Sequence, residues 1–280
     1  MKKLFFIPTI IAAFVFSSCT EENDEGSISD ALLEQIDADS EAALEANYED
    51  IEMVAEAGLA SLSDEGRVER DTLLNCAEVD HDTENKTMII DYGDGCTIRG
   101  GRVLSGRIII AYNERRLEPG ASRTVTLENF FVDEVQVEGT RSWTNISKTI
   151  EDNPKFNTQL VGGKLTFSDG TIATREANHT KEWLRASNPL DDESLLDGSA
   201  EGVNRENITY QVEILETLVY KRTCRAEKVF VPVSGIKQIT KGEDIAIINY
   251  GEGECDNEVT ITLNGETFTK IIEPRGKRRK

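Results

Sequence analysis

Hydrophobic residues recur at two different periods along the chain. Over residues 29–65, apolar side chains fall three and four positions apart, as at Tyr48 and Ile51, and this spacing predicts an amphipathic helix. Over residues 66–273, apolar and polar positions alternate within short segments, and this alternation predicts strands. The sequence therefore predicts an acidic helical region followed by a β-domain.

The polar face of the helical region consists almost entirely of Glu and Asp. Such a helix could dock on the β-domain through its apolar stripe, or it could stand free as a spacer. The run Asp37-Ala38-Asp39-Ser40 could divide it into two helices. The breadth of the stripe favours docking.

The clearest strand pattern is Ile208–Tyr220, where Tyr210 and Val212 share one face and Gln211 and Glu213 the other. Further strands are predicted at Thr87–Tyr92, Arg107–Tyr112, Thr124–Val132, Val135–Ile146, Leu160–Phe167, Ile172–Arg185, Val229–Val233, Ile245–Tyr250, Val259–Leu263 and Glu266–Ile272. About a dozen short strands, separated by Gly, Asn and Asp turns, predict a mainly β fold. We expect a large antiparallel sheet or a β-sandwich.

The β-domain contains one internal similarity. Residues 89–96 read Ile-Ile-Asp-Tyr-Gly-Asp-Gly-Cys, and residues 247–255 read Ile-Ile-Asn-Tyr-Gly-Glu-Gly-Glu-Cys. Each copy has a cysteine upstream and a predicted hairpin downstream. We interpret this as a duplicated unit at about residues 70–112 and 220–273.

The cysteines follow this duplication. If Cys19 is modified as argued below, four cysteines remain in the chain. An exported protein with four cysteines is expected to form two disulfides, with three connectivities open. The repeat favours Cys76–Cys96 and Cys224–Cys255, in which a cysteine pins each turn to the preceding strand; a bond between Cys96 and Cys255 stays open as the alternative.

The first 18 residues have the anatomy of a secretory signal peptide. Lys2 and Lys3 precede an apolar run over residues 4–16, and Ser17-Ser18 then leads to Cys19. The run is shorter than the roughly 20 residues of a membrane-spanning helix. The segment resembles the lipobox of bacterial lipoproteins, which implies that Cys19 is acylated and anchors the mature chain to membrane lipid.

The acidic linker after Cys19, residues 19–28, resembles the export signals of surface lipoproteins in Bacteroidota. Thr20 also differs from the aspartate that retains enterobacterial lipoproteins in the inner membrane. The resemblance extends loosely over the whole chain, to the Tyr-Gly-acid-Gly-Cys units. It implies the outer membrane, facing the cell surface, with the periplasmic face as the alternative; it implies no activity.

The formal net charge is -21, and removal of Lys2 and Lys3 makes the mature chain more negative still. Such a surface repels nucleic acid, so none is expected as a partner. A glycan or an envelope protein is compatible with it. The tail at residues 274–280, which carries five cations, is predicted to be a disordered solvated end.

One predicted strand face stands out in this acidic chain. Arg175, His179, Lys181, Trp183 and Arg185 share one side of the segment that begins at Ile172. They form either a solvated face whose cations pair with acids, or an anion or glycan platform on which Trp183 stacks. We take them as the candidate ligand-binding residues.

Other chemistry finds little support. There are two histidines and no Cys-x-x-Cys spacing, so neither a metal centre nor a cofactor is expected. Asp91 and Asp94 could supply oxygens to calcium, but a plain β-turn is the simpler interpretation. His81, between two aspartates, is expected in a turn, and Trp143 is expected in the core.

Three functions remain open: a non-catalytic binding or adhesion module, a structural or accessory envelope component, and a glycan hydrolase. A deep cleft with two converging carboxylates beside Trp183 would favour the hydrolase. An open basic face would favour the binding module, and a face covered by the acidic helix would favour the structural role.

The first prediction concerns Cys19. Mass spectrometry of the membrane fraction is expected to find Cys19 as an acylated N-terminal residue, because the segment before it has the features of a lipobox. A Cys19→Ser variant should lose the acyl chains and leave the membrane fraction. A wild-type chain that starts at another residue, without acyl groups, would contradict the lipoprotein assignment.

Overall fold

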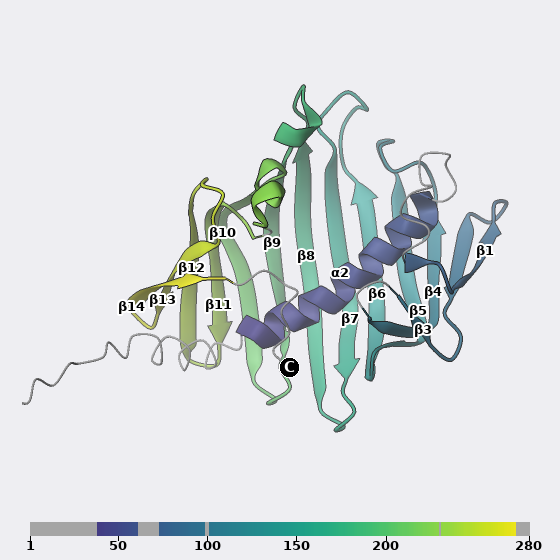
Figure 1. Ribbon diagram of the computed structural model, residues 1–280, viewed down its shortest axis with the longest axis horizontal. Helices are drawn as coiled ribbons and strands as arrows, with labels where there is room; N and C mark the ends of the chain where they lie inside the picture. The colour runs from purple at the N-terminus through teal and green to yellow at the C-terminus, as the bar shows by residue number, and fades with distance from the viewer. Residues whose placement is uncertain (1–37, 61–72, 99–100, 230, 273–280) are drawn as a thin grey trace, which may run out of the picture.

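The computed structural model describes residues 38–60, 73–98, 101–229 and 231–272. One helix, α2 (Ala38–Ala60), lies across one face of a single 14-stranded antiparallel sheet (Figure 1). The protein is therefore mainly β. Of the two architectures expected from the sequence, it adopts the large antiparallel sheet.

The strands follow one another through the sheet almost in chain order. Each pairs with its sequence neighbours, except that β2 pairs with β4 and the short β3 pairs only with β4. The strands are β1 Glu78–Asp82, β2 Thr87–Asp91, β3 Cys96–Thr97, β4 Val103–Tyr112, β5 Ser122–Val132, β6 Val135–Asn145, β7 Lys155–Thr166, β8 Ile172–Leu184, β9 Glu193–Val203, β10 Thr209–Lys221, β11 Ser234–Lys241, β12 Asp244–Glu252, β13 Glu258–Leu263 and β14 Glu266–Ile271. Two short 3₁₀ helices, η2 (Pro189–Asp191) and η3 (Thr223–Glu227), flank β9 and β10.

The helix is docked on the sheet rather than free. Tyr48, Ile51 and Val54 are each at most 2 % exposed and belong to the main hydrophobic core. The Tyr48 hydroxyl also donates a 2.8 Å hydrogen bond to the Glu138 carbonyl oxygen on β6. Burial raises the pKa of Tyr48 well above its usual value, so the phenol stays a neutral donor.

Close approach of helix and sheet depends on a small residue near the helix end. A Cβ atom at Gly58 would lie 2.8 Å from the Ile90 side chain and 2.9 Å from the Met88 sulfur on β2. Both distances are shorter than Cβ contacts normally are, so a larger residue at position 58 would have to displace the buried side chains of Ile90 and Met88.

The strand predictions fail at identifiable places. Val229–Val233 is not among the described strands; Val229 and Val233 are instead buried beside Cys224 in a segment after η3. His81 lies on β1 rather than in a turn. Strands β1, β3, β9 and β11 are missing from the prediction. Polar and small residues interrupt the alternation in β1, β9 and β11, where neighbouring strands supply the pairing that local preference does not, and β3 is only two residues long.

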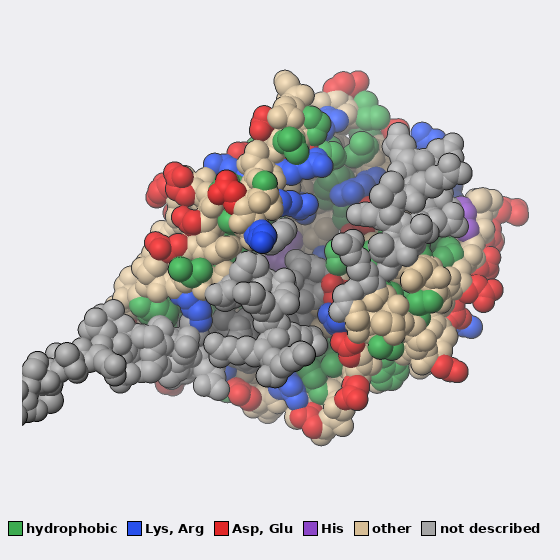
Figure 2. Space-filling model, viewed as in Figure 1, with side chains coloured by type: hydrophobic (Ala, Val, Ile, Leu, Met, Phe, Trp, Pro, Cys, Tyr) green, Lys and Arg blue, Asp and Glu red, His purple; other side chains and the backbone are tan. Residues whose placement is uncertain are grey.

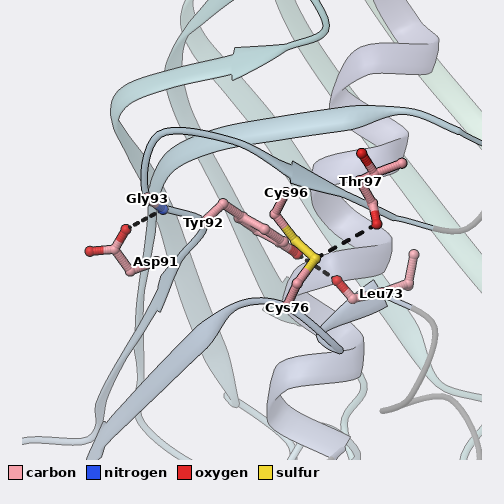
Figure 3. The surroundings of a disulfide bond; sticks show 7 residues. All are labelled: Leu73, Cys76, Asp91, Tyr92, Gly93, Cys96 and Thr97. Atoms are coloured by element: carbon pink, nitrogen blue, oxygen red, sulfur yellow. Dashed lines mark hydrogen bonds between the residues drawn. A yellow bond between two sulfur atoms is a disulfide. The ribbon is translucent and has the colours of Figure 1, made fainter.

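Each disulfide closes a segment that contains one hairpin. Cys76 pairs with Cys96, and Cys224 with Cys255, with Cα–Cα distances of 5.9 and 5.0 Å. Around the first bond, the buried Tyr92 donates a 2.9 Å hydrogen bond to the Leu73 carbonyl oxygen (Figure 3). The disulfide and the tyrosine thus hold the segment before β1 against the turn after β2.

The two cysteine units follow a similar path. A hairpin lies between each pair of cysteines, β1–β2 in one unit and β11–β12 in the other, and a strand after the second cysteine pairs back on it. In the strand order, the first unit lies at the β1 edge of the sheet and the second lies near the β14 edge. One detail of the prediction was wrong: the upstream cysteine precedes the hairpin, in a turn or in η3, instead of lying on a strand. Duplication stays a hypothesis.

Several predicted segments lie outside the described residues. They are the signal peptide, Cys19, the acidic linker, the parts of the helical region before Ala38 and after Ala60, and the basic tail.

The second prediction tests helix docking with two positions on α2. Ile51→Ala should lower the free energy of unfolding by about 2–5 kcal/mol, because it removes buried methyl groups at a side chain that is 2 % exposed. Met53→Ala is the control, since Met53 is 52 % exposed; it should change stability by less than about 0.5 kcal/mol. Urea unfolding followed by circular dichroism measures both, and equal losses would contradict the docked arrangement.

Candidate functional site

The structure separates the five predicted platform residues. Lys181 and Trp183 line one hollow on the face of β8, whereas His179 lines a second and very small one. Arg175 is 2 % exposed and buried in the face of the sheet. Arg185 lies just past the end of β8 and donates to the carbonyl oxygens of residues 150–152. Two of the five residues therefore share the larger site.

The larger site is a cavity of about 400 Å³ between the ends of β7–β10 and η3. It is lined by five cationic side chains, one carboxylate, and aromatic and aliphatic side chains. We call it the basic hollow and define it by Arg116, Phe156, Lys181, Trp183, Asp192, Ser194, Tyr220, Lys221, Arg222, Arg225, Val229 and Val231. Figure 2 shows lysine and arginine side chains gathered around a recess on this face of the molecule.

Asp192 organises the middle of the basic hollow. It is 5 % exposed, and its Oδ2 accepts a 3.0 Å hydrogen bond from the Trp183 indole nitrogen. The other carboxylate oxygen accepts from the Ala186 amide at 2.9 Å, and the Arg222 guanidinium lies 3.7 Å from Oδ2. Because both oxygens are engaged, Asp192 fixes the indole ring in place.

The end of β10 and the segment after it supply three of the cations. The Arg222 amide donates a 3.0 Å hydrogen bond to the Asp192 carbonyl oxygen. Lys221 Nζ donates to the Gly253 carbonyl oxygen at 2.8 Å. Cys224, which is 1 % exposed, anchors η3 to the loop before β13 through its disulfide with Cys255. This disulfide therefore fixes the part of the chain that carries Arg222 and Arg225.

Arg116 reaches the basic hollow from the loop between β4 and β5. Its guanidinium carbon lies 5.3 Å from the centre of the Phe156 ring and 5.7 Å from that of Trp143. These two rings stack at 4.5 Å. A cation over stacked aromatic faces is attracted by their negative faces. Trp143 is buried, as expected from the sequence.

The acidic helix covers a neighbouring part of the same basic face. Arg123 on β5 is only 4 % exposed and pairs with both Glu52 and Glu56 of α2, the latter at 2.8 Å. Glu52 also lies 3.5 Å from Arg141 on β6, and Glu56 lies 3.3 Å from Arg116. None of the described residues of α2 lines the basic hollow. The helix therefore pairs with Arg123 and Arg141 beside the basic hollow and with one cation of the hollow itself, Arg116.

The remaining sequence candidates lie elsewhere. Asp91 accepts a 2.7 Å hydrogen bond from Arg107 and a 2.8 Å bond from the Gly93 amide, and Arg107 is the main cause of its lowered pKa. Asp94 is exposed on the same turn. Over the residues that the structure describes, no three His, Cys, Asp or Glu side chains converge as a metal site would require.

His81 has one neighbour of interest. Its ring nitrogen Nε2 lies 2.6 Å from the Tyr112 hydroxyl, and the two rings stack at 6.0 Å. This pair is on the β1 side of the sheet, away from the basic hollow. It joins β1 to β4 and gives His81 a structural role.

Sequence reasoning missed most of the cations in the basic hollow. Lys221, Arg222 and Arg225 surround Cys224 in the run Lys-Arg-Thr-Cys-Arg, which is a visible signal in so acidic a chain. Nothing in the sequence connects Arg116 to that run, because they meet only through the pairing of five intervening strands.

Comparison of the chain with protein-family models, with curated proteins and with solved structures finds no significant match. Within the described ranges, no helix is both long enough and apolar enough to cross a bilayer.

The third prediction concerns the buried carboxylate. Asp192→Asn should lower the free energy of unfolding by about 1–3 kcal/mol, because one of its two acceptor oxygens becomes an amide donor. Asp191→Asn is the matched control, since Asp191 is exposed and bonds only locally, to Asn188. Urea unfolding measures stability, and the indole N–H resonance of Trp183 reports the lost bond. Equal effects of the two substitutions would contradict the role given to Asp192.

Proposed function

We propose that this protein is a lipid-anchored lipoprotein of the bacterial outer membrane whose β-domain binds a ligand in the basic hollow without catalysing a reaction. One observation carries the binding role. In a chain with 52 acidic and 31 basic residues, five cations line a single cavity with one carboxylate. Holding like charges together costs free energy, which a bound ligand of opposite charge offsets.

The proposed location and lipid attachment rest on the sequence alone. The signal-peptide anatomy before Cys19 and the acidic linker after it support acylation, export to the outer membrane and display on the cell surface. Docked helix α2 then begins at Ala38, so only a short segment separates the proposed anchor from the sheet. The periplasmic face stays the alternative.

The geometry of the lining favours binding over glycoside hydrolysis. Hydrolysis needs two carboxyl groups roughly 5–9.5 Å apart, one of which gives up a proton. Asp192 is the one carboxylate among the residues that line the basic hollow, and both its oxygens accept hydrogen bonds. Its position suits a residue that orients Trp183.

A second candidate, a structural envelope component, has its own support. The acidic helix pairs with Arg123 and Arg141 on the face of the sheet, so part of that face serves packing. The two roles are compatible, because none of the described residues of α2 lines the basic hollow and Arg116 is the one lining cation for which a pair with the helix is shown. Binding remains our first proposal.

The fourth prediction tests where binding occurs. The full acylated chain in detergent micelles is expected to bind a component of an array of envelope glycans and polymers, and Trp183→Leu should weaken that binding at least fivefold. Ile172→Ala is the control on the same strand, since Ile172 is exposed and does not line the basic hollow. Circular dichroism checks that both variants fold. Binding that survives Trp183→Leu unchanged, or no binding at all, would contradict the proposal.

A further inference from the structure

We infer that the basic hollow recognises a small acidic saccharide, meaning one or two sugar rings that carry a carboxylate, sulfate or phosphate group. The inference rests on the proposed function and adds to it the chemical class of the ligand. It follows from three properties of the lining: its charge, its aromatic side chains and its size.

The charge of the lining calls for an anion. The cations come from three separate parts of the chain: Arg116 before β5, Lys181 on β8, and the group Lys221, Arg222 and Arg225 at the end of β10 and in η3. Two of these cations have acidic neighbours: Arg222 lies near Asp192, the one carboxylate of the lining, and Arg116 pairs with Glu56 of α2. The five cations still outnumber these two acids. Cations arranged around a cavity can contact several oxygens of one ligand, and arginine matches carboxylate, sulfate and phosphate oxygens in pairs.

Several of these cations are held in position before any ligand arrives. Arg116 lies between Glu56 and the stacked rings of Phe156 and Trp143. Lys221 is bonded to the Gly253 carbonyl oxygen, and the Cys224 disulfide fixes the helix that carries Arg225. Preorganised groups lose less conformational freedom on binding, which strengthens recognition.

The aromatic side chains call for a ring rather than a bare ion. Trp183 and Tyr220 line the cavity and are half-buried, and the indole of Trp183 is fixed by Asp192. Phe156 also lines it, but that ring is buried and stacked on Trp143, so it supports Arg116 and is not a surface for a sugar. The face of an aromatic ring carries partial negative charge, which attracts the weakly positive C–H groups on the flat side of a sugar. Ser194 adds a hydroxyl that can exchange hydrogen bonds with sugar hydroxyls.

The size and surroundings limit the ligand to a small one. About 400 Å³ lies at the low end of the roughly 300–1,000 Å³ typical of small-molecule sites. The whole chain carries a formal net charge of -21 and repels a long polyanion such as nucleic acid. A single acidic sugar, or the acidic end of a glycan, meets the cations without meeting that repulsion.

The fifth prediction uses a matched series of probes. Isothermal titration of the full chain in detergent micelles compares N-acetylglucosamine, glucuronic acid, N-acetylglucosamine 6-sulfate, glucose 6-phosphate and inorganic phosphate. At least one acidic sugar should bind about tenfold more tightly than N-acetylglucosamine and than inorganic phosphate. Its affinity should fall as salt rises, because ions screen the cations.

Two arginines supply the variants. Arg225→Glu should weaken binding of the acidic sugar about tenfold, because it puts a carboxylate where the ligand's charge would lie. Arg115→Glu makes the same change of charge at an exposed residue that adjoins Arg116 but does not line the cavity; its effect should stay below about twofold. Thermal unfolding of both variants checks that the fold is kept.

Each outcome decides a separate point. Selective binding that Arg225→Glu weakens and Arg115→Glu does not would support the inference. Equal binding of N-acetylglucosamine and the acidic sugars would overturn it, yet would leave a ligand-binding hollow in place. Inorganic phosphate binding as tightly as every acidic sugar would also overturn it, by assigning a simple anion site. Failure of all five probes would overturn the saccharide class, while the broader array still tests the proposed function.

Discussion

Docking of helix α2 is the interaction on which this structure depends. A single antiparallel sheet has two broad faces, and its apolar face must pack against another element to form a core. Tyr48, Ile51 and Val54 provide that cover. Arg123, also buried in this face, would be costly without a counterion. The same helix supplies it through Glu52 and Glu56, so one element satisfies both requirements.

The disulfides stabilise the regions near the two edges of the sheet, at β1 and at β14. Cys76–Cys96 holds the segment before β1, and Cys224–Cys255 holds η3 against the loop before β13. The second loop is longer, with a sequence separation of 31 residues against 20. The added length includes η3, and η3 carries a cation of the basic hollow. The second cysteine unit therefore supplies one side of the site, and strands β7 to β9 with the loop before β5 supply the rest.

The strands with regular alternation could be predicted from the sequence, and so could the docked helix and both disulfide pairings. Strands β9 and β11 could not, because residues such as Gly198 and Gly235 carry no strand preference of their own. Their conformation comes from pairing with β8, β10 and β12. The candidate site was found only in part for a similar reason. Alternation placed Lys181 and Trp183 on one face, but only the sheet brings Arg116 to them.

The distribution of charge explains how so acidic a protein can hold a basic site. Acids dominate the chain as a whole, and their field falls off over about 8–10 Å at physiological salt. Five cations line the basic hollow, against one lining carboxylate, Asp192, and one further acid, Glu56, that pairs with Arg116. The pairing of α2 with Arg123 and Arg141 withdraws two further arginines from solvent. The cations of the basic hollow form a local positive site on a protein that is acidic as a whole. A small anion can contact these cations, whereas a large polyanion also meets the surrounding negative charge.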